Sequence, residues 1–150
     1  MITSIQSQES AVGRVVTPIK VENLEDLFRA KKRDIPPGQV RMLELNDALV
    51  DTGTTLLSLP KGMIKQLGLD FLYTRRGTTT SGFRKVKVYS SVRLTIQGRD
   101  CRVDVAEVSD KTPALVGQVP LELLDLVVDP RQARLIPNPA HGGEWMIEMY

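Results

Sequence analysis

The sequence predicts one domain built mainly of β-strands, with a few short helices. Its 150 residues match the length of one ordinary domain and are enough to bury a hydrophobic core. Aromatic residues make up only 5% of the chain, so the core must depend on Val, Leu and Ile, which favour strands. Apolar and polar residues alternate over several stretches separated by turn residues, which is typical of antiparallel strands.

The composition narrows the class of protein. The net charge of +2 is too small to indicate a nucleic-acid or membrane-surface partner. The single cysteine cannot form an internal disulfide bond, and residues 1–10 lack the apolar segment of a secretory signal. No apolar run approaches the length of about 20 residues that a membrane helix needs. We therefore expect a soluble, cytoplasmic protein that binds neither nucleic acid nor membrane.

A tail, a strand and a helix are expected before the central part of the chain. Residues 1–12 are polar and predict a flexible tail ahead of one domain, residues 13–150. The apolar alternation over 15–21 predicts a strand, with an edge position or a bend at Pro18. Residues 22–33 have helical spacing.

The basic run at 29–33 has two interpretations. It is either a nucleic-acid patch or the solvated end of a helix, whose cations suit the negative end of the helix dipole. We favour the second interpretation, because a nucleic-acid site requires a wider basic surface.

The remaining elements are predicted from turn residues and alternation. A hairpin with strands at 39–45 and 48–50 and a turn at Asn46-Asp47 leads into Asp51. After it we expect a helix at 61–67 capped by Ser58 and stopped by Gly68, a mobile hairpin tip at 77–82, strands at 86–96 and 101–105 around a turn at 97–100, a strand at 114–116, a helix at 120–127 ended by Asp129-Pro130, and a short strand at 134–136.

Ala-Leu-Val-Asp-Thr-Gly-Thr, residues 48–54, is the stretch that points to chemistry. An apolar strand brings the Asp51 carboxylate to a turn, Gly53 allows close backbone approach, and a threonine hydroxyl can lock the turn by a hydrogen bond. One such carboxylate is an ordinary turn residue. Two of them about 3 Å apart cannot both ionise, so they share a proton near neutral pH. One can then activate water while the protonated partner polarises a peptide carbonyl.

The sequence resembles the retropepsins, the single-domain aspartic proteases of retroviruses and their bacterial and cellular relatives. The likeness covers about residues 39 to 128: the motif at 48–54, a Gly-rich flap whose descending strand is similar to 81–86, and Leu115-Val116-Gly117 before a helix. The tail at 126–139 looks more like bacterial members than viral enzymes. The resemblance implies a closed barrel that forms half of an acid protease, with a flap hairpin and without cofactor or metal.

The resemblance also implies roles for individual residues. Asp51 would be the catalytic carboxylate, supported by Thr52, which would interlock with its symmetry mate, and by Gly53 and Thr54. The flap tip would be Thr80, Ser81 and Gly82, and the active-site loop would be braced by Leu115, Val116 and Gly117. The chain departs from the viral pattern at Thr55-Leu56, in a flap with fewer glycines, and in an insertion at 22–38.

A second copy of the chain is expected because the sequence contains one Asp-Thr-Gly triplet and no Asp-Ser-Gly. A two-fold axis supplies the second Asp51, so we expect a homodimer that hydrolyses an extended peptide. Residues 144–150 have two open interpretations: they pair as a strand in the dimer interface, or they cover the core of their own domain.

Other sites have weaker support. His141 precedes Gly142-Gly143 as in some esterases, but no nucleophile elbow accompanies it, so a surface loop is expected there. One His and one Cys lack zinc-ligand spacing, and Cys101 lies on the apolar face of a strand. The alternative function is a non-proteolytic module on the same fold that binds a peptide or protein by strand addition.

Overall fold

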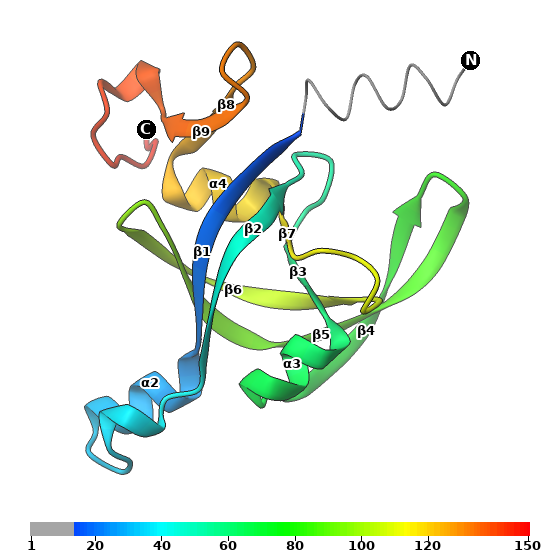
Figure 1. The fold of residues 1–150 in the computed structure, drawn as a ribbon, viewed down its shortest axis with the longest axis vertical. Helices are drawn as coiled ribbons and strands as arrows, with labels where there is room; N and C mark the ends of the chain where they lie inside the picture. The colour runs from blue at the N-terminus through cyan, green and yellow to red at the C-terminus, as the bar shows by residue number, and fades with distance from the viewer. Residues whose placement is uncertain (1–13) are drawn as a thin grey trace.

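The computed structural model describes residues 14–150, and the flexible tail expected at 1–12 lies outside the described residues. Its strands are β1 (Val15–Asn23), β2 (Met42–Val50), β3 (Leu57–Pro60), β4 (Phe71–Thr79), β5 (Gly82–Ile96), β6 (Arg99–Val108), β7 (Leu115–Val116), β8 (Leu126–Asp129) and β9 (Arg134–Pro137). The helices are α2 (Leu24–Lys31), α3 (Lys61–Leu67) and α4 (Gln118–Leu124), with short 3₁₀ turns at Pro37–Gln39 and Pro139–His141. The fold is mainly β with short helices, which confirms the predicted class (Figure 1).

Seven strands form one sheet in the order β1-β2-β7-β3-β6-β5-β4, and β8 and β9 form a separate hairpin. β1 also pairs with β5 through residues 20–23. The strands β1, β2, β7, β3, β6 and β5 therefore close into a ring in that order (Figure 1). β4 lies outside this ring and pairs with β5. The resemblance implies a closed barrel, whereas the structure has a ring-like sheet with one strand outside it.

The core consists of aliphatic side chains, as the scarcity of aromatic residues predicts. The most deeply buried large side chains come from β1, β3, β5, β6, β7, α3 and α4: Val21, Leu57, Leu59, Leu67, Val88, Val92, Leu94, Ile96, Val105, Val116, Leu121 and Leu124. Phe28, Phe71, Phe83 and Trp145 are all exposed instead. Tyr89 is partly buried and packs against the core, so the aromatic contribution to the interior is small.

The hairpin turn predicted at Asn46-Asp47 is wrong. β2 continues through both residues and pairs with β1 on either side of them. Asn46 and Asp47 lie opposite Pro18, where the register of β1 and β2 shifts. A bulge tolerates a proline that lacks an N–H, and both polar residues point to solvent there. The bend predicted at Pro18 is confirmed.

The helices are also placed differently in detail. α3 ends at Gly68, whose φ of 64° is left-handed as predicted, but Ser58 lies in β3 and caps nothing. α4 ends earlier than the predicted helix at 120–127, because Asp125 adopts a left-handed φ of 55° and stops it. The following residues form β8 instead. Among residues 14–150, no helix combines the length and apolar character needed to cross a membrane.

Candidate active site

Asp51 begins the loop that joins β2 to β3, residues 51–56. β7 lies between these two strands: it is parallel to β2 and antiparallel to β3. The loop therefore passes the end of β7 before it enters β3. This topology brings the two expected site segments, 51–54 and 115–117, side by side although they are far apart in the sequence.

Both oxygens of the Asp51 carboxylate accept hydrogen bonds from the same loop. The N–H of Gly53 donates to Oδ1 at 3.0 Å, and the hydroxyl of Thr54 donates to Oδ2 at 2.9 Å. The backbone is fixed as well, since the N–H of Asp51 donates to the carbonyl of Val116 at 2.9 Å. Asp51 is half-buried, so its unused lone pairs can meet water or a second carboxyl group.

Gly117 permits the close approach of β7 and the loop. Its N–H donates to the carbonyl of Leu56 at 3.0 Å, and the next N–H, of Gln118, donates to the carbonyl of Thr54 at 2.7 Å. A Cβ on Gly117 would lie 2.3 Å from the Leu56 oxygen and 2.5 Å from the Thr54 oxygen. Because these contacts are with backbone atoms, no side-chain rotation could relieve them. Gly117 is needed here for its size, since its φ of −87° is open to any residue.

Thr52 and the flap tip are not joined to Asp51 within one chain. Thr52 is exposed, and its hydroxyl has no hydrogen-bond partner among residues 14–150. The interlocking of Thr52 with a symmetry mate requires a second chain and stays a prediction. Two hollows of the described surface, one lined by residues within 30–37 and one by residues 148–150, include neither Asp51 nor the flap tip.

The hairpin of β4 and β5 confirms the predicted turn at its tip. The hydroxyl of Thr79 donates to the carbonyl of Gly82 at 2.8 Å and lies 3.1 Å from the Ser81 hydroxyl. Gly82 has a left-handed φ of 114°, which favours glycine. Figure 1 shows the hairpin projecting from the body, with its tip at Thr80 and Ser81 apart from the 51–56 loop.

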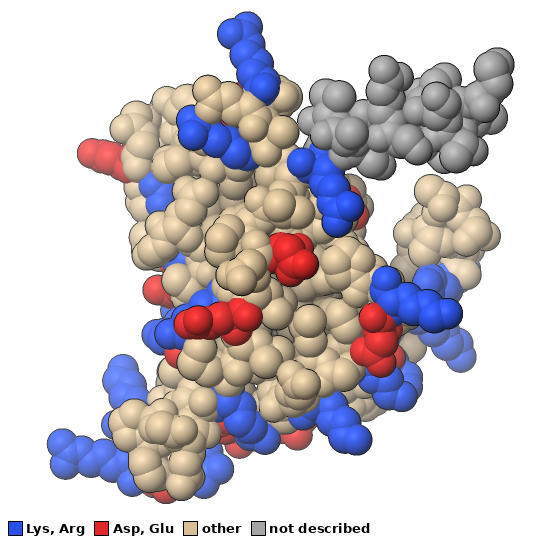
Figure 2. Space-filling view, in the orientation of Figure 1, with Lys and Arg blue, Asp and Glu red and all other residues tan. Residues whose placement is uncertain are grey.

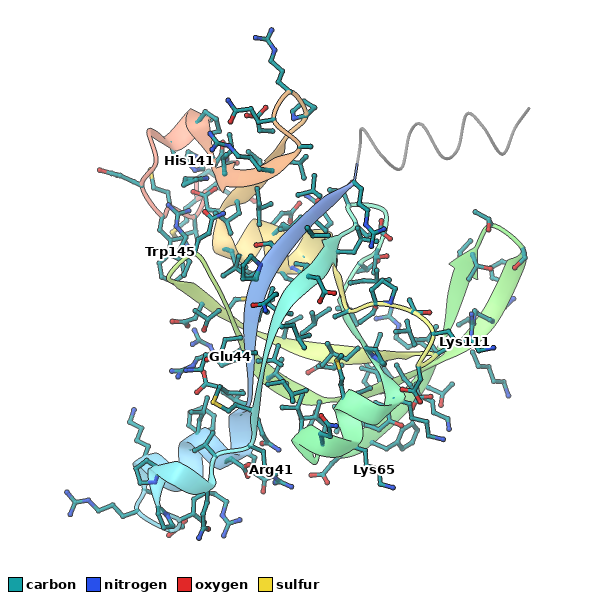
Figure 3. The ribbon with its side chains drawn as sticks, in the orientation of Figure 1. Arg41, Glu44, Lys65, Lys111, His141 and Trp145 are labelled. Atoms are coloured by element: carbon teal, nitrogen blue, oxygen red, sulfur yellow. The ribbon has the colours of Figure 1, made fainter. Side chains whose placement is uncertain are left out.

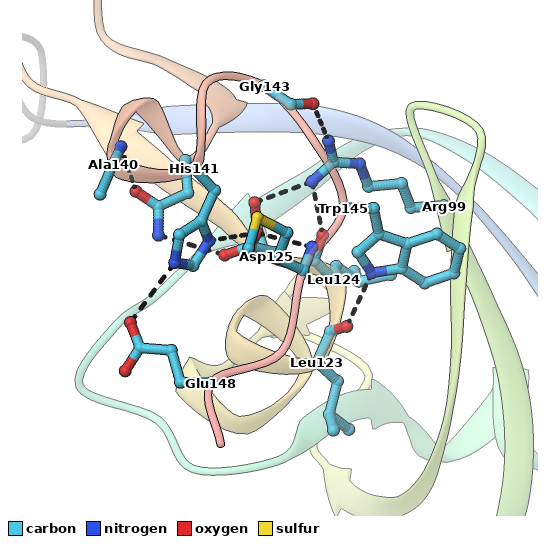
Figure 4. A network of polar contacts seen from close by, with 11 residues as sticks. Arg99, Leu123, Leu124, Asp125, Ala140, His141, Gly143, Trp145 and Glu148 are labelled. Atoms are coloured by element: carbon cyan, nitrogen blue, oxygen red, sulfur yellow. Dashed lines mark hydrogen bonds and ion pairs between the residues drawn. The ribbon is translucent and has the colours of Figure 1, made fainter. Parts of the chain in front are cut away.

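A second polar cluster, which the sequence did not indicate, lies after α4. Nδ1 of His141 is 2.7 Å from Oδ2 of Asp125, which also accepts the N–H of Met146 at 3.1 Å, while Oδ1 accepts Nδ2 of Asn138 at 3.1 Å (Figure 4). The hydrogen bond from His141 holds the pKa of the Asp125 carboxyl below its ordinary value. The same bond raises the pKa of His141, and Glu148, 3.4 Å from Nε2, adds to the effect.

This cluster attaches the C-terminal segment to its own domain. The indole N–H of Trp145 donates to the carbonyl of Leu123 at 3.1 Å, and Arg99 donates to the carbonyl of Gly143 at 2.7 Å. His141 and Trp145 lie together at the end of the molecule opposite Arg41 (Figure 3). Residues 144–150 form no strand, and Ile147 remains 70% exposed. The segment thus touches its own domain without burying its apolar side chains.

Among residues 14–150, neither Cys101 nor any group of metal ligands forms a site. Cys101 is buried in β6, as predicted, and burial raises the pKa of its thiol to about 11. In the part of the chain that the structure describes, no three His, Cys, Asp or Glu side chains gather as metal ligands.

Comparison with known proteins does not assign a function to the chain. No protein-family model matches the chain, and no curated protein matches it significantly. A functional interpretation therefore depends on the Asp-Thr-Gly motif and on the geometry around Asp51.

Proposed function

We propose that the chain is one half of a homodimeric aspartic endopeptidase of the retropepsin type, in which each copy contributes Asp51. The observation that carries the proposal is the pair of hydrogen bonds from Gly53 and Thr54 to the two oxygens of Asp51. They orient a half-buried carboxylate at the end of a strand, next to a glycine-dependent brace at 115–117. A surface aspartate in a simple turn has no need of that brace.

The second carboxylate would come from a second copy. One chain contains one Asp-Thr-Gly triplet, and a two-fold axis puts the same residue on both sides. Two Asp51 carboxyl groups about 3 Å apart hold one proton between them, because two negative charges at that distance are strongly unfavourable. The pair then contains a base and an acid without a metal or cofactor.

Hydrolysis follows from these two protonation states. The ionised Asp51 removes a proton from a water molecule, whose oxygen attacks the peptide carbonyl carbon while the protonated Asp51 donates to the carbonyl oxygen. The Asp51 that took a proton from water passes it to the peptide nitrogen of the resulting tetrahedral diol. The C–N bond then breaks, and one diol hydroxyl gives its proton to the other Asp51, so that an amine and a carboxylic acid leave and the dyad again holds one shared proton. No covalent enzyme intermediate forms.

The flap would complete the site around the substrate. Thr80, Ser81 and Gly82 form the tip of a hairpin that projects from the body, so a hinge movement of β4 and β5 can cover a bound peptide (Figure 1). Covering the peptide excludes bulk water from the dyad, and this strengthens the electrostatic interactions of the reaction.

Cleavage of a peptide pool tests the proposal. The full chain should cut peptides internally, pepstatin should inhibit the cleavage, and Asp51→Asn should abolish it. Asp47→Asn is the matched control, because Asp47 is an exposed carboxylate on β2, the strand that leads into Asp51. A chain that forms dimers but cuts nothing between about pH 3 and about pH 8 would refute the protease proposal.

One observation favours a second candidate, a binding module without proteolysis. β4 is an edge strand of the sheet, and Phe71, Leu72 and Tyr73 on it are 54%, 49% and 40% exposed. An edge with unpaired backbone groups and apolar side chains accepts an extended peptide by strand addition. Peptide binding that survives Asp51→Asn, in a wild type without cleavage, would support this candidate.

A further inference from the structure

The hairpin of β4 and β5 carries an unbalanced positive charge. Residues 71–89 contain no Asp or Glu, and their basic residues are Arg75, Arg76, Arg84, Lys85 and Lys87. All 18 acidic residues lie elsewhere, so the rest of the chain is net acidic although the total charge is +2. Within residues 14–150, none of these basic side chains forms an ion pair. On the face shown in Figure 2, both basic and acidic side chains border the base of the hairpin, and the tip is uncharged.

The register of the hairpin assigns Arg75 and Arg84 to one face. Arg75 pairs with Val86, and Arg84 pairs with Gly77. Paired residues share a face of an antiparallel ladder, and so do residues two apart on one strand. The face continues into Val88, which pairs with Ala106. Across the sheet Ala106 pairs with Ser58, and Ser58 pairs with Leu115, so this face is the one that carries Leu115 beside the Asp51 loop, opposite the face of the core. We call this the inner face of the flap.

The other basic residues lie on the opposite, outer face. Arg76 pairs with Lys85, and Lys87 is two residues further along β5. The guanidinium carbon of Arg76 lies 4.2 Å from the ring centroid of Phe83, so this arginine is already engaged by an aromatic face. The outer face continues into Tyr89 and not toward Leu115, so it provides matched cations on the side of the hairpin away from the Leu115 face.

We infer that Arg75 and Arg84 form a cationic subsite on the inner face of the flap, which selects peptides with Asp or Glu near the scissile bond. The inference rests on the proposed function, because the flap must close over a peptide. Gly77 opposite Arg84 has no side chain, so no cross-strand side chain covers that guanidinium. Residues 52–56 of the active-site loop are uncharged and supply no attraction for a basic peptide side chain.

The chemistry of arginine matches this role. A guanidinium binds a carboxylate through two parallel hydrogen bonds, and it stays charged at every working pH. The pair is weak while it is exposed to water and becomes stronger once a closed flap excludes water. A two-fold dimer has two flaps, so an acidic side chain is favoured on both sides of the scissile bond.

The test measures kcat/KM of the full chain on two peptide pools with an apolar centre, one with Glu and one with Gln at the flanking positions. The wild type should prefer the Glu pool about fivefold or more, and the preference should weaken as salt rises. Arg75→Gln combined with Arg84→Gln should remove the preference. Lys85→Gln combined with Lys87→Gln removes the same charge from the outer face and should retain it. Arg84→Glu should shift the preference toward a pool with flanking Lys.

A binding measurement separates this inference from the proposed function. Fluorescence polarisation of the labelled Glu and Gln pools on Asp51→Asn should show tighter binding of the Glu pool, dependent on Arg75 and Arg84. If the wild type cleaves both pools equally, or if both double variants lose the preference equally, the subsite is refuted while the protease stands. If the wild type cleaves nothing but binds the Glu pool through these arginines, the subsite stands and the protease is refuted. Equal binding of both pools by Asp51→Asn overturns the subsite whatever the cleavage result.

Discussion

Gly117→Ala should destabilise the chain more than the addition of one methyl group suggests. The added methyl group would lie 2.3 Å from the Leu56 oxygen and 2.5 Å from the Thr54 oxygen. Ordinary carbon–oxygen contact begins near 3.4 Å, so the loop must move by about 1 Å. That movement stretches the hydrogen bonds from Gly117 to Leu56 and from Gln118 to Thr54.

The expected loss combines two effects. Two backbone hydrogen bonds contribute about 1 kcal/mol each, and overpacking a tight contact costs about 1–3 kcal/mol. Because some of this relaxes, the free energy of unfolding should fall by about 3 kcal/mol, which corresponds to about 6–12 °C in Tm for a domain of this size. The displaced loop also carries Asp51, so any peptide cleavage should fall with the stability.

Urea unfolding followed by far-UV circular dichroism measures the effect, at one fixed protein concentration because dimerisation would add to the stability. Gly38→Ala is the matched control, since a Cβ there would meet nothing within 4 Å. It should change the free energy of unfolding by less than about 0.5 kcal/mol. If the free energy of unfolding of Gly117→Ala lies within about 0.5 kcal/mol of the wild-type value, the loop does not depend on the close approach at Gly117, and the predicted destabilisation is refuted.

Three further predictions concern the other polar and reactive groups. His141 is the only histidine, so its NMR titration is unambiguous, and its pKa should lie above the ordinary value of about 6.5; a lower pKa would contradict the contact with Asp125. Because the pKa of His141 is raised in the folded state, the stabilisation by its pair with Asp125 disappears as pH rises from about 6.5 through the folded pKa of His141. At acid pH the same stabilisation disappears as pH falls through the lowered pKa of Asp125. His141→Gln should flatten the alkaline decline in thermal stability, and an unchanged decline would exclude the pair as its source. Thr54→Val removes the hydroxyl that donates to Asp51 at 2.9 Å and should lower kcat/KM about tenfold, while Thr54→Ser retains most of the activity; equal activity of Thr54→Val would show that this bond is dispensable. Cys101, whose pKa is raised to about 11, should resist a thiol reagent at about pH 8 until the chain unfolds, and rapid labelling of the folded protein would contradict its burial.

The sequence predicted the β class because aliphatic alternation is a local signal. The strands at β5 and β6, the turn between them and the glycine stop of α3 all follow from residues close together in the chain. The turn predicted at Asn46-Asp47 failed because the deciding partner was distant: these two residues form a bulge opposite Pro18 on β1, and β2 continues through them. Local turn preference gave way to strand pairing.

The candidate site was likewise predictable in part, where the resemblance indicated its residues, and unpredictable where the contacts depend on distant segments. The pairing of 51–54 with 115–117 is expected from the resemblance, and the structure places these segments together through β7. The cluster of Asp125 and His141 could not be found, because a single histidine in a glycine-rich stretch has no periodicity to place it. The only local signal was Asp125 at the end of the predicted helix, because aspartate adopts the left-handed conformation more readily than most residues. The two faces of the flap likewise depend on hairpin register.

The proposed mechanism requires two Asp51 carboxylates acting together, and mixing wild type with Asp51→Asn tests this directly. After subunit exchange at constant total concentration, peptide cleavage should follow the square of the wild-type fraction, so an equal mixture should retain about a quarter of the activity of pure wild type. Activity that falls in proportion to the wild-type fraction, to about a half in the equal mixture, would mean that each chain works with its own Asp51 alone and would contradict the shared dyad.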